Sequence, residues 1–150
     1  KALLAAKICA YAQGFALIKA GDKEHDWQLP MDKVASVWRA GCIIRAHLLE
    51  DIRRAFANQQ HLTNLLVDDH FARVMAECQQ DLREVVAMGA LHGVAVPSFM
   101  SALSYYDAYR SARLPANLLQ AQRDYFGAHQ YQRIDRPGKF HTQWPKASKS

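Results

Sequence analysis

Apolar side chains recur along this chain at intervals of three and four residues, which is the spacing that places them on one face of an α-helix. The first such stripe covers residues 1 to about 20, and Gly21 is suited to the left-handed conformation that ends many helices. The apolar positions of the stripe are Leu4, Ile8, Tyr11, Phe15 and Ile18. A polar segment over residues 21–30, closed by Pro30, is predicted to be a loop.

Two shorter helical segments are predicted next. Asp32 is a suitable capping residue for a short helix through Arg39, and a second segment is expected from about Gly41 to Ala57. The inward-facing positions of that second segment are Ile44, Leu48, Ile52, Ala55 and Phe56.

The longest helix is predicted to follow a connector over residues 64–69 that contains a small apolar plug. Either Asp68 or Asp69 can cap this helix, which should run to about Leu91 and stop at Gly93. Its apolar stripe comprises Phe71, Val74, Met75, Cys78, Leu82, Val85 and Val86.

Two prolines mark the starts of the last two predicted helices. Pro97 and Pro115 are each placed as a first helical residue, and the final helix should end near Gly127. The pattern gives about six helices and no strand, so the fold class is all-α, with a bundle-like helical domain over residues 1–129. An extended tail over residues 130–150 is expected to follow it.

The composition is that of a single globular domain. The chain has 150 residues, of which 50% are hydrophobic and 22% charged. No run approaches the roughly 20 apolar residues that cross a bilayer, so no membrane association is expected. Cys9, Cys42 and Cys78 lie among apolar helical neighbours, which favours buried, reduced thiols of a cytoplasmic protein over a redox or metal role.

The net charge of +5 belongs mainly to the C-terminal segment. Residues 115–150 hold six basic and two acidic side chains. Such a segment can attract nucleic acid, an acidic surface or a phosphorylated small molecule. Nucleic acid is the weaker choice, because glycine, proline and aromatic residues separate the basic ones instead of a helix arraying them on one face.

Neither a dinucleotide-binding motif nor a metal site is predicted. No G-x-G-x-x-G string follows a strand-like run. His47 with Glu50, and the cluster over residues 68–70, do not bring three ligands to one helix face, and an aspartate of that cluster is already explained as a cap.

Two long strings carry a family resemblance: QRDYFGAH at 122–129 and WRAGCIIR at 38–45. With these strings, and from YAQGF at 11–15 to the tail, the chain resembles the C-terminal helical domain of decarboxylating 6-phosphogluconate dehydrogenases. The resemblance implies an NADP-dependent, cytoplasmic homodimer that converts 6-phosphogluconate to ribulose 5-phosphate and carbon dioxide in the pentose phosphate pathway. It also implies that the cofactor domain and the catalytic lysine and glutamate lie upstream, so we expect this chain to be the last third of such an enzyme, without catalytic residues of its own.

Arg123 and His129 are the site residues that the resemblance implies. In that family the matching arginine and histidine enter the neighbouring subunit's active site and bind the substrate phosphate. A guanidinium fork suits this role because it meets two phosphate oxygens at once and stays charged, here from an expected place in the last turn of its helix. Gly127 is expected to set the direction of the segment that carries His129, and the tail is expected to pack on the partner subunit. For Arg45 an ion pair is favoured over a ligand contact.

Two other classes of function stay open on the sequence alone. One is a helical dimerisation module without substrate contact. The other is a helical scaffold whose basic tail binds nucleic acid, which would show steeply salt-dependent binding of DNA or RNA.

The isolated 150-residue chain is expected to be inactive, because the cofactor domain and the catalytic groups are assigned to an upstream region. An absorbance assay for NADPH with 6-phosphogluconate and the purified chain checks this. Measurable turnover would contradict the assignment.

Overall fold

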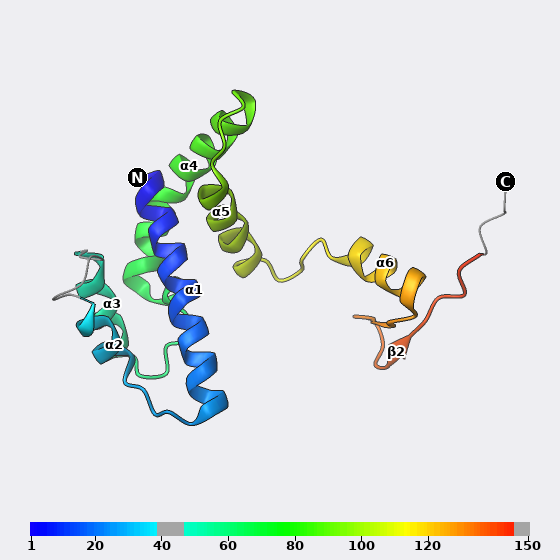
Figure 1. Cartoon of the computed structure of the whole chain (residues 1–150), viewed down its shortest axis with the longest axis horizontal. Coiled ribbons are helices and arrows are strands. Elements are labelled where there is room, and N and C mark those ends of the chain that lie inside the picture. The colour runs from blue at the N-terminus through cyan, green and yellow to red at the C-terminus, as the bar shows by residue number, and fades with distance from the viewer. Residues whose placement is uncertain (39–46, 146–150) are drawn as a thin grey trace. The chain divides into compact units, whose positions relative to one another are not determined.

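The computed structural model describes residues 1–38 and 47–145 of the chain, and it confirms a mostly helical fold. The chain forms two compact units, residues 1–109 and 110–150 (Figure 1). The last helix belongs to the second unit, whereas the division after residue 129 expected from the sequence groups it with the preceding helices.

Helix α1 (Ala2–His25) is longer than predicted. Gly21 does not end it; the left-handed residue is Asp26, with φ 50°. The ring of Trp27 packs over Gly21, where a Cβ atom would lie 3.0 Å from it. The predicted stop at Gly21 was therefore wrong, because this glycine provides room for a ring and not a left-handed turn.

Among the described residues, α1 is also the one helix long and apolar enough to cross a membrane by length and composition alone, with a stretch of mean hydropathy 1.3. Judged by length and composition alone, the expectation that no apolar stretch approaches the length needed to cross a bilayer was therefore wrong. Ile8, Cys9 and Phe15 of α1 are nevertheless buried, and the helix packs against α4 and α5. These contacts are those of the central helix of a helical bundle.

Helices α2 (Met31–Val37) and α3 (Leu48–Asn58) pack against each other. Asp32 was predicted to cap α2 but lies inside its first turn, because Pro30 takes the position before the helix and no side chain caps it. The buried residues of α3 are Leu48, Leu49, Ile52, Ala55 and Phe56. The predicted helix end at Arg39, the start at Gly41, and Cys42, Ile44 and Arg45 lie outside the described residues.

The connector after α3 contains a short 3-10 helix, η1 (Leu65–Val67), whose Leu65 is fully buried. Asn64 holds this turn, since its Oδ1 accepts from Leu66 N at 2.9 Å and its Nδ2 donates to the Tyr105 hydroxyl at 2.7 Å. The apolar plug predicted in the connector is this turn, Leu65–Val67, and the buried amide of Asn64 links it to α5.

Helix α4 (Asp69–Leu91) confirms the prediction at both ends. The Asp68 carboxylate caps it by accepting from His70 N at 3.0 Å and Phe71 N at 3.1 Å. Beyond the helix, Gly93 has φ 67°, a left-handed conformation. The buried side of α4 is formed by Phe71, Met75, Cys78 and Leu82, while Val85 is partly exposed.

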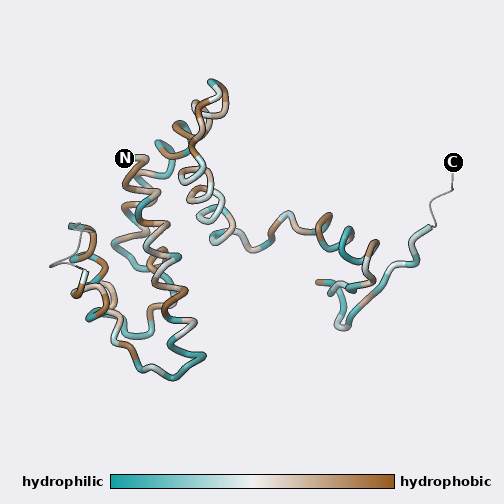
Figure 2. Tube along the Cα trace, viewed as in Figure 1, coloured by the Kyte–Doolittle hydropathy of each residue, from teal (hydrophilic) through white to brown (hydrophobic). Residues whose placement is uncertain are grey.

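Helix α5 (Pro97–Tyr109) begins at the predicted proline and completes the first unit. Arg83 of α4 donates to Asp107 of α5 at 2.8 Å. The core of this unit consists of side chains from α1 to α5 and η1, and apolar residues recur along these helices among polar ones (Figure 2).

The second unit consists of α6 (Asn117–Gly127) and a small hairpin of β1 (Tyr131–Gln132) and β2 (Lys139–Phe140). The hairpin pairs antiparallel, with Tyr131 opposite Phe140. No strand was predicted, because two residues are too few to show a period of two. Pro115 was predicted as the first residue of α6, but the helix begins two residues later, at Asn117.

The cap of α4 gives a stability prediction. Asp68→Ala should lower the free energy of unfolding by about 0.5–2 kcal/mol, since two amide donors lose their acceptor. Asp69→Ala is the matched control, because Asp69 lies in the first turn of α4, where its charge favours the helix dipole but does not cap the helix. Urea unfolding of both variants checks this, and equal losses would contradict the assignment of the cap to Asp68.

Candidate functional site

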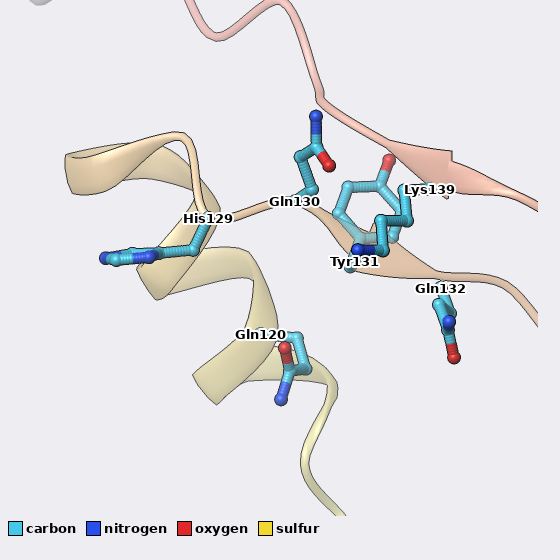
Figure 3. A pocket seen from close by; sticks show the side chains of 6 residues that line it. All are labelled: Gln120, His129, Gln130, Tyr131, Gln132 and Lys139. Atoms are coloured by element: carbon cyan, nitrogen blue, oxygen red, sulfur yellow. The ribbon is translucent and has the colours of Figure 1, made fainter.

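A hollow of about 410 Å³ lies beside the end of α6 in the second unit. Figure 3 shows the six side chains that line it: Gln120, His129, Gln130, Tyr131, Gln132 and Lys139. Each of them carries a hydrogen-bond donor, and none is acidic. The hollow is therefore suited to a ligand rich in acceptors, such as a phosphate or a carboxylate.

His129 lies directly against the end of α6 (Figure 3). A Cβ atom on Gly127 would approach Cδ2 and Nε2 of the His129 ring to 2.6 Å, so the ring occupies space that only glycine leaves free. The left-handed residue that ends the helix is Ala128, with φ 49°. Gly127 was expected to set the direction of the chain; its observed role is to admit the imidazole.

The backbone on both sides of His129 adopts an unusual conformation. Ala128 and Gln130 have φ 49° and 63°, in the left-handed region that non-glycine residues seldom occupy. Asp124 holds both: its backbone oxygen accepts from Ala128 N at 3.0 Å, and its Oδ1 accepts from Gln130 N at 3.1 Å. Such strain persists only where surrounding bonds enforce it.

The Asp124 side chain is fully buried and accepts four hydrogen bonds. Besides Gln130 N, the donors are His141 Nδ1, Thr142 N and Trp144 Nε1, each at 2.9 Å. The sequence reasoning missed this residue. One signal was present: an acid near the C-terminal end of a helix is disfavoured by the helix dipole, so it needs donors from elsewhere.

The environment of Asp124 decides its charge. Burial raises the pKa of this carboxyl, but hydrogen bonds from Thr142, His141 and Trp144, together with the positive charge that His141 can carry, outweigh burial and lower the pKa to about 2. The group is therefore an anion at neutral pH, fully engaged with its own chain.

Arg123 is exposed on α6 and does not line the hollow. It was expected in the last turn of the helix, but that turn contains no basic residue, so Arg123 lies just before it. Within the described part of the chain, its guanidinium has no hydrogen bond or ion pair. Gln120, three residues earlier, does line the hollow, and residues at this spacing are neighbours on a helix surface.

The aromatic residues of the tail have partners within the second unit. Tyr131 packs on Phe140 with ring centroids 6.3 Å apart, and Trp144 meets Tyr125 edge to face at 5.6 Å. The Tyr131 hydroxyl lies 2.8 Å from Thr142 Oγ1. The aromatic side chains of the tail thus have partners on α6 and within the tail itself.

The remaining candidate ligands are dispersed. Over residues 1–38 and 47–145, no three His, Cys, Asp or Glu side chains group in a way that could hold a metal ion. Cys9 and Cys78 are buried and free. Burial chiefly raises the pKa of the Cys9 thiol to about 11, which keeps it protonated.

Comparison with known proteins extends these observations. The family model described as "6-phosphogluconate dehydrogenase, C-terminal domain" matches residues 1–144. The decarboxylating 6-phosphogluconate dehydrogenase of Staphylococcus epidermidis is 53% identical over 144 residues, which cover 96% of this chain and 31% of that protein. The NADP(+)-dependent enzyme of Bacillus subtilis is 53% identical over 146 residues, which cover 97% and 31%.

A solved structure agrees with these matches. It is the 6-phosphogluconate dehydrogenase of Plasmodium falciparum, described in its apo form and in complexes with its cofactor NADP+ and its substrate 6-phosphogluconate. The TM-score is 0.89 at 41% identity, over 95% of this chain and 31% of that one. The chain thus spans about a third of the length of the relatives it matches.

The lowered pKa of Asp124 predicts how the tail responds to acid. Because the folded pKa of about 2 lies below the value near 4 of an unfolded aspartate, this group stabilises the folded tail fully above about pH 4. The stabilisation should be lost as the pH falls from about 4 to about 2. The Trp144 indole N–H resonance reports it, and Asp124→Asn should lack this step. An identical acid transition in that variant would contradict the prediction.

Proposed function

Because the chain belongs to the 6-phosphogluconate dehydrogenase family, as its C-terminal domain, we propose that it is part of an NADP-dependent enzyme that oxidises and decarboxylates 6-phosphogluconate. The products are ribulose 5-phosphate and carbon dioxide, and the reaction belongs to the pentose phosphate pathway in the cytoplasm. The names and substrate of the relatives support this proposal. Hydride and proton transfer are assigned to residues outside this chain, which would contribute substrate binding and subunit assembly.

The substrate contacts of the proposal are made by Arg123 and His129, which bind the phosphate in the neighbouring subunit's site. The observation that carries this part is the hollow at His129, lined only by donor-bearing side chains and free of carboxylates. The nearest acid in sequence, Asp124, is fully occupied by four donors, so it does not neutralise the exposed Arg123 guanidinium.

A phosphate contact of this kind serves the reaction from a distance. The phosphate lies away from the carbon that is oxidised, so its binding energy orients the sugar for hydride transfer without taking part in it. The guanidinium supplies two parallel donors and the imidazole supplies one more.

The homodimer of the proposal is supported by the exposed apolar surface of the second unit. The large apolar side chains that are at least half exposed there are Leu114, Leu118, Leu119, Tyr125, Phe126 and Ile134. Clustered exposed apolar residues mark interaction surfaces. In the proposed dimer, this surface and the tail pack on the partner subunit, which brings Arg123 and His129 to the partner's site.

Nucleic-acid binding receives less support from the tail. The Arg133 guanidinium donates to Asp135 at 2.6 and 2.8 Å, and the Arg136 guanidinium lies 4.6 Å from the centre of the Phe140 ring. These two charges are already engaged within the hairpin.

Substitution of Arg123 in the full-length enzyme tests the phosphate contact. Arg123→Ala should weaken substrate binding about 10- to 150-fold, the effect of about 1.5–3 kcal/mol for a hydrogen bond to a charged group. Arg123→Lys should recover only part of the loss, because an ammonium lacks the bidentate fork. Arg113→Ala, which removes an equal charge from the loop before α6, is the control and should bind nearly normally.

A mixed dimer tests whether the site is shared between subunits. One subunit carries Arg123→Ala and the other lacks the upstream catalytic lysine. A shared site leaves one of the two sites intact, and about half of the wild-type activity should survive. A nearly inactive mixed dimer would show that each site is built from a single chain.

A further inference from the structure

We propose that Asp124 is a positioning residue for His129, and that Gly127 completes the seat in which the imidazole is held. This inference rests on the proposed phosphate contact of His129 and adds the elements that hold the ring in place. Asp124 itself is fully buried, so it acts through His129 and not by touching the ligand.

The first support is the backbone around His129. The residues before and after it are both left-handed without being glycine, and each is tied by its amide to Asp124. One amide binds the aspartate's main-chain oxygen and the other its carboxylate. The peptide that carries the imidazole is therefore held at both ends by a single residue.

The second support is that the two carboxylate oxygens of Asp124 bind different sets of donors. Oδ1 accepts from Gln130 N and lies 2.9 Å from His141 Nδ1, whereas Oδ2 accepts from Thr142 N and Trp144 Nε1. Oδ2 thus binds the tail alone, whereas Oδ1 binds the loop of His129 and also the tail, through His141. This separation allows the two roles to be tested by different substitutions.

The third support is the contact between Gly127 and the His129 ring. A methyl group on residue 127 would overlap the ring at 2.6 Å, and the exposed ring would have to leave its place. Gly127 lies within α6 and its φ is not positive, so alanine suits its backbone and should favour the helix. Gly127→Ala therefore moves the ring without disturbing the Asp124 hydrogen bonds.

The test measures binding of 6-phosphogluconate and of inorganic phosphate to the full-length protein by titration calorimetry. Asp124→Asn and Gly127→Ala should each weaken binding about 10-fold, the lower limit expected for the loss of a hydrogen bond to a charged group. Trp144→Phe is the matched control. It removes one donor from Oδ2 only and should change affinity less than about twofold.

Double variants separate positioning from general support of the fold. On a His129→Ala background, neither Asp124→Asn nor Gly127→Ala should weaken binding further, because the group they position is gone. A further loss on that background would overturn the inference for the residue concerned. If Asp124→Asn fails to fold, the comparison of Gly127→Ala in the wild-type and His129→Ala backgrounds decides whether the ring of His129 is held in place.

The failure of this inference differs from the failure of the proposed function. Unchanged phosphate binding in the single variant His129→Ala would refute the phosphate contact itself. Weakened binding in His129→Ala together with normal binding in both Asp124→Asn and Gly127→Ala would leave that contact standing and refute the positioning roles.

Discussion

The second unit depends on one buried carboxylate, Asp124. Within its described residues, 110–145, this is the only fully buried side chain, and it takes the place that a hydrophobic core has in a larger domain. A segment this small buries too little apolar surface to hold itself together by that means alone. Four donors from two places in the chain, the loop after α6 and the tail, converge on the two oxygens and join these segments to the end of α6.

Asp124 also makes the two sides of α6 different from each other. Adjacent residues on a helix point about 100° apart, so the neighbour of the buried Asp124 is turned toward solvent. That neighbour is Arg123. The carboxylate is satisfied inside the unit while the guanidinium stays available outside it, although the two charges are consecutive in sequence. This arrangement gives the surface near the hollow a positive character.

The sequence predicted features that depend on local periodicity and capping. The stripe of α4, the cap at Asp68 and the start of α5 at Pro97 are local, and all three were found. Two glycines have a role in the structure that the sequence did not reveal. Gly21 was taken as the mark of a helix end, but α1 continues past it, whereas α6 does end at Gly127 as predicted. Each of the two glycines also makes room for a ring that comes from further along the chain, Trp27 and His129 respectively. A glycine in sequence does not reveal which of these two roles it has.

The Asp124 network could not be predicted from local pattern either. Its donors come from residues 130–144, and no period of two or 3.6 relates an acid on a helix to a tryptophan twenty residues later. The positions of Arg123 and His129 on α6 and just after it could be predicted, but the strained backbone that presents His129 could not. The family resemblance supplied the two proposed ligand residues, whereas only the structure shows what holds one of them.

A crystal structure of the full-length protein with 6-phosphogluconate bound would show whether Asp124 holds His129 in place to bind the substrate phosphate. We expect the Arg123 guanidinium and the His129 imidazole within about 2.7–3.2 Å of the phosphate oxygens in the neighbouring subunit's site. We also expect the Asp124 hydrogen bonds to be unchanged in that complex. A phosphate bound by other residues, with His129 turned to solvent, would contradict it.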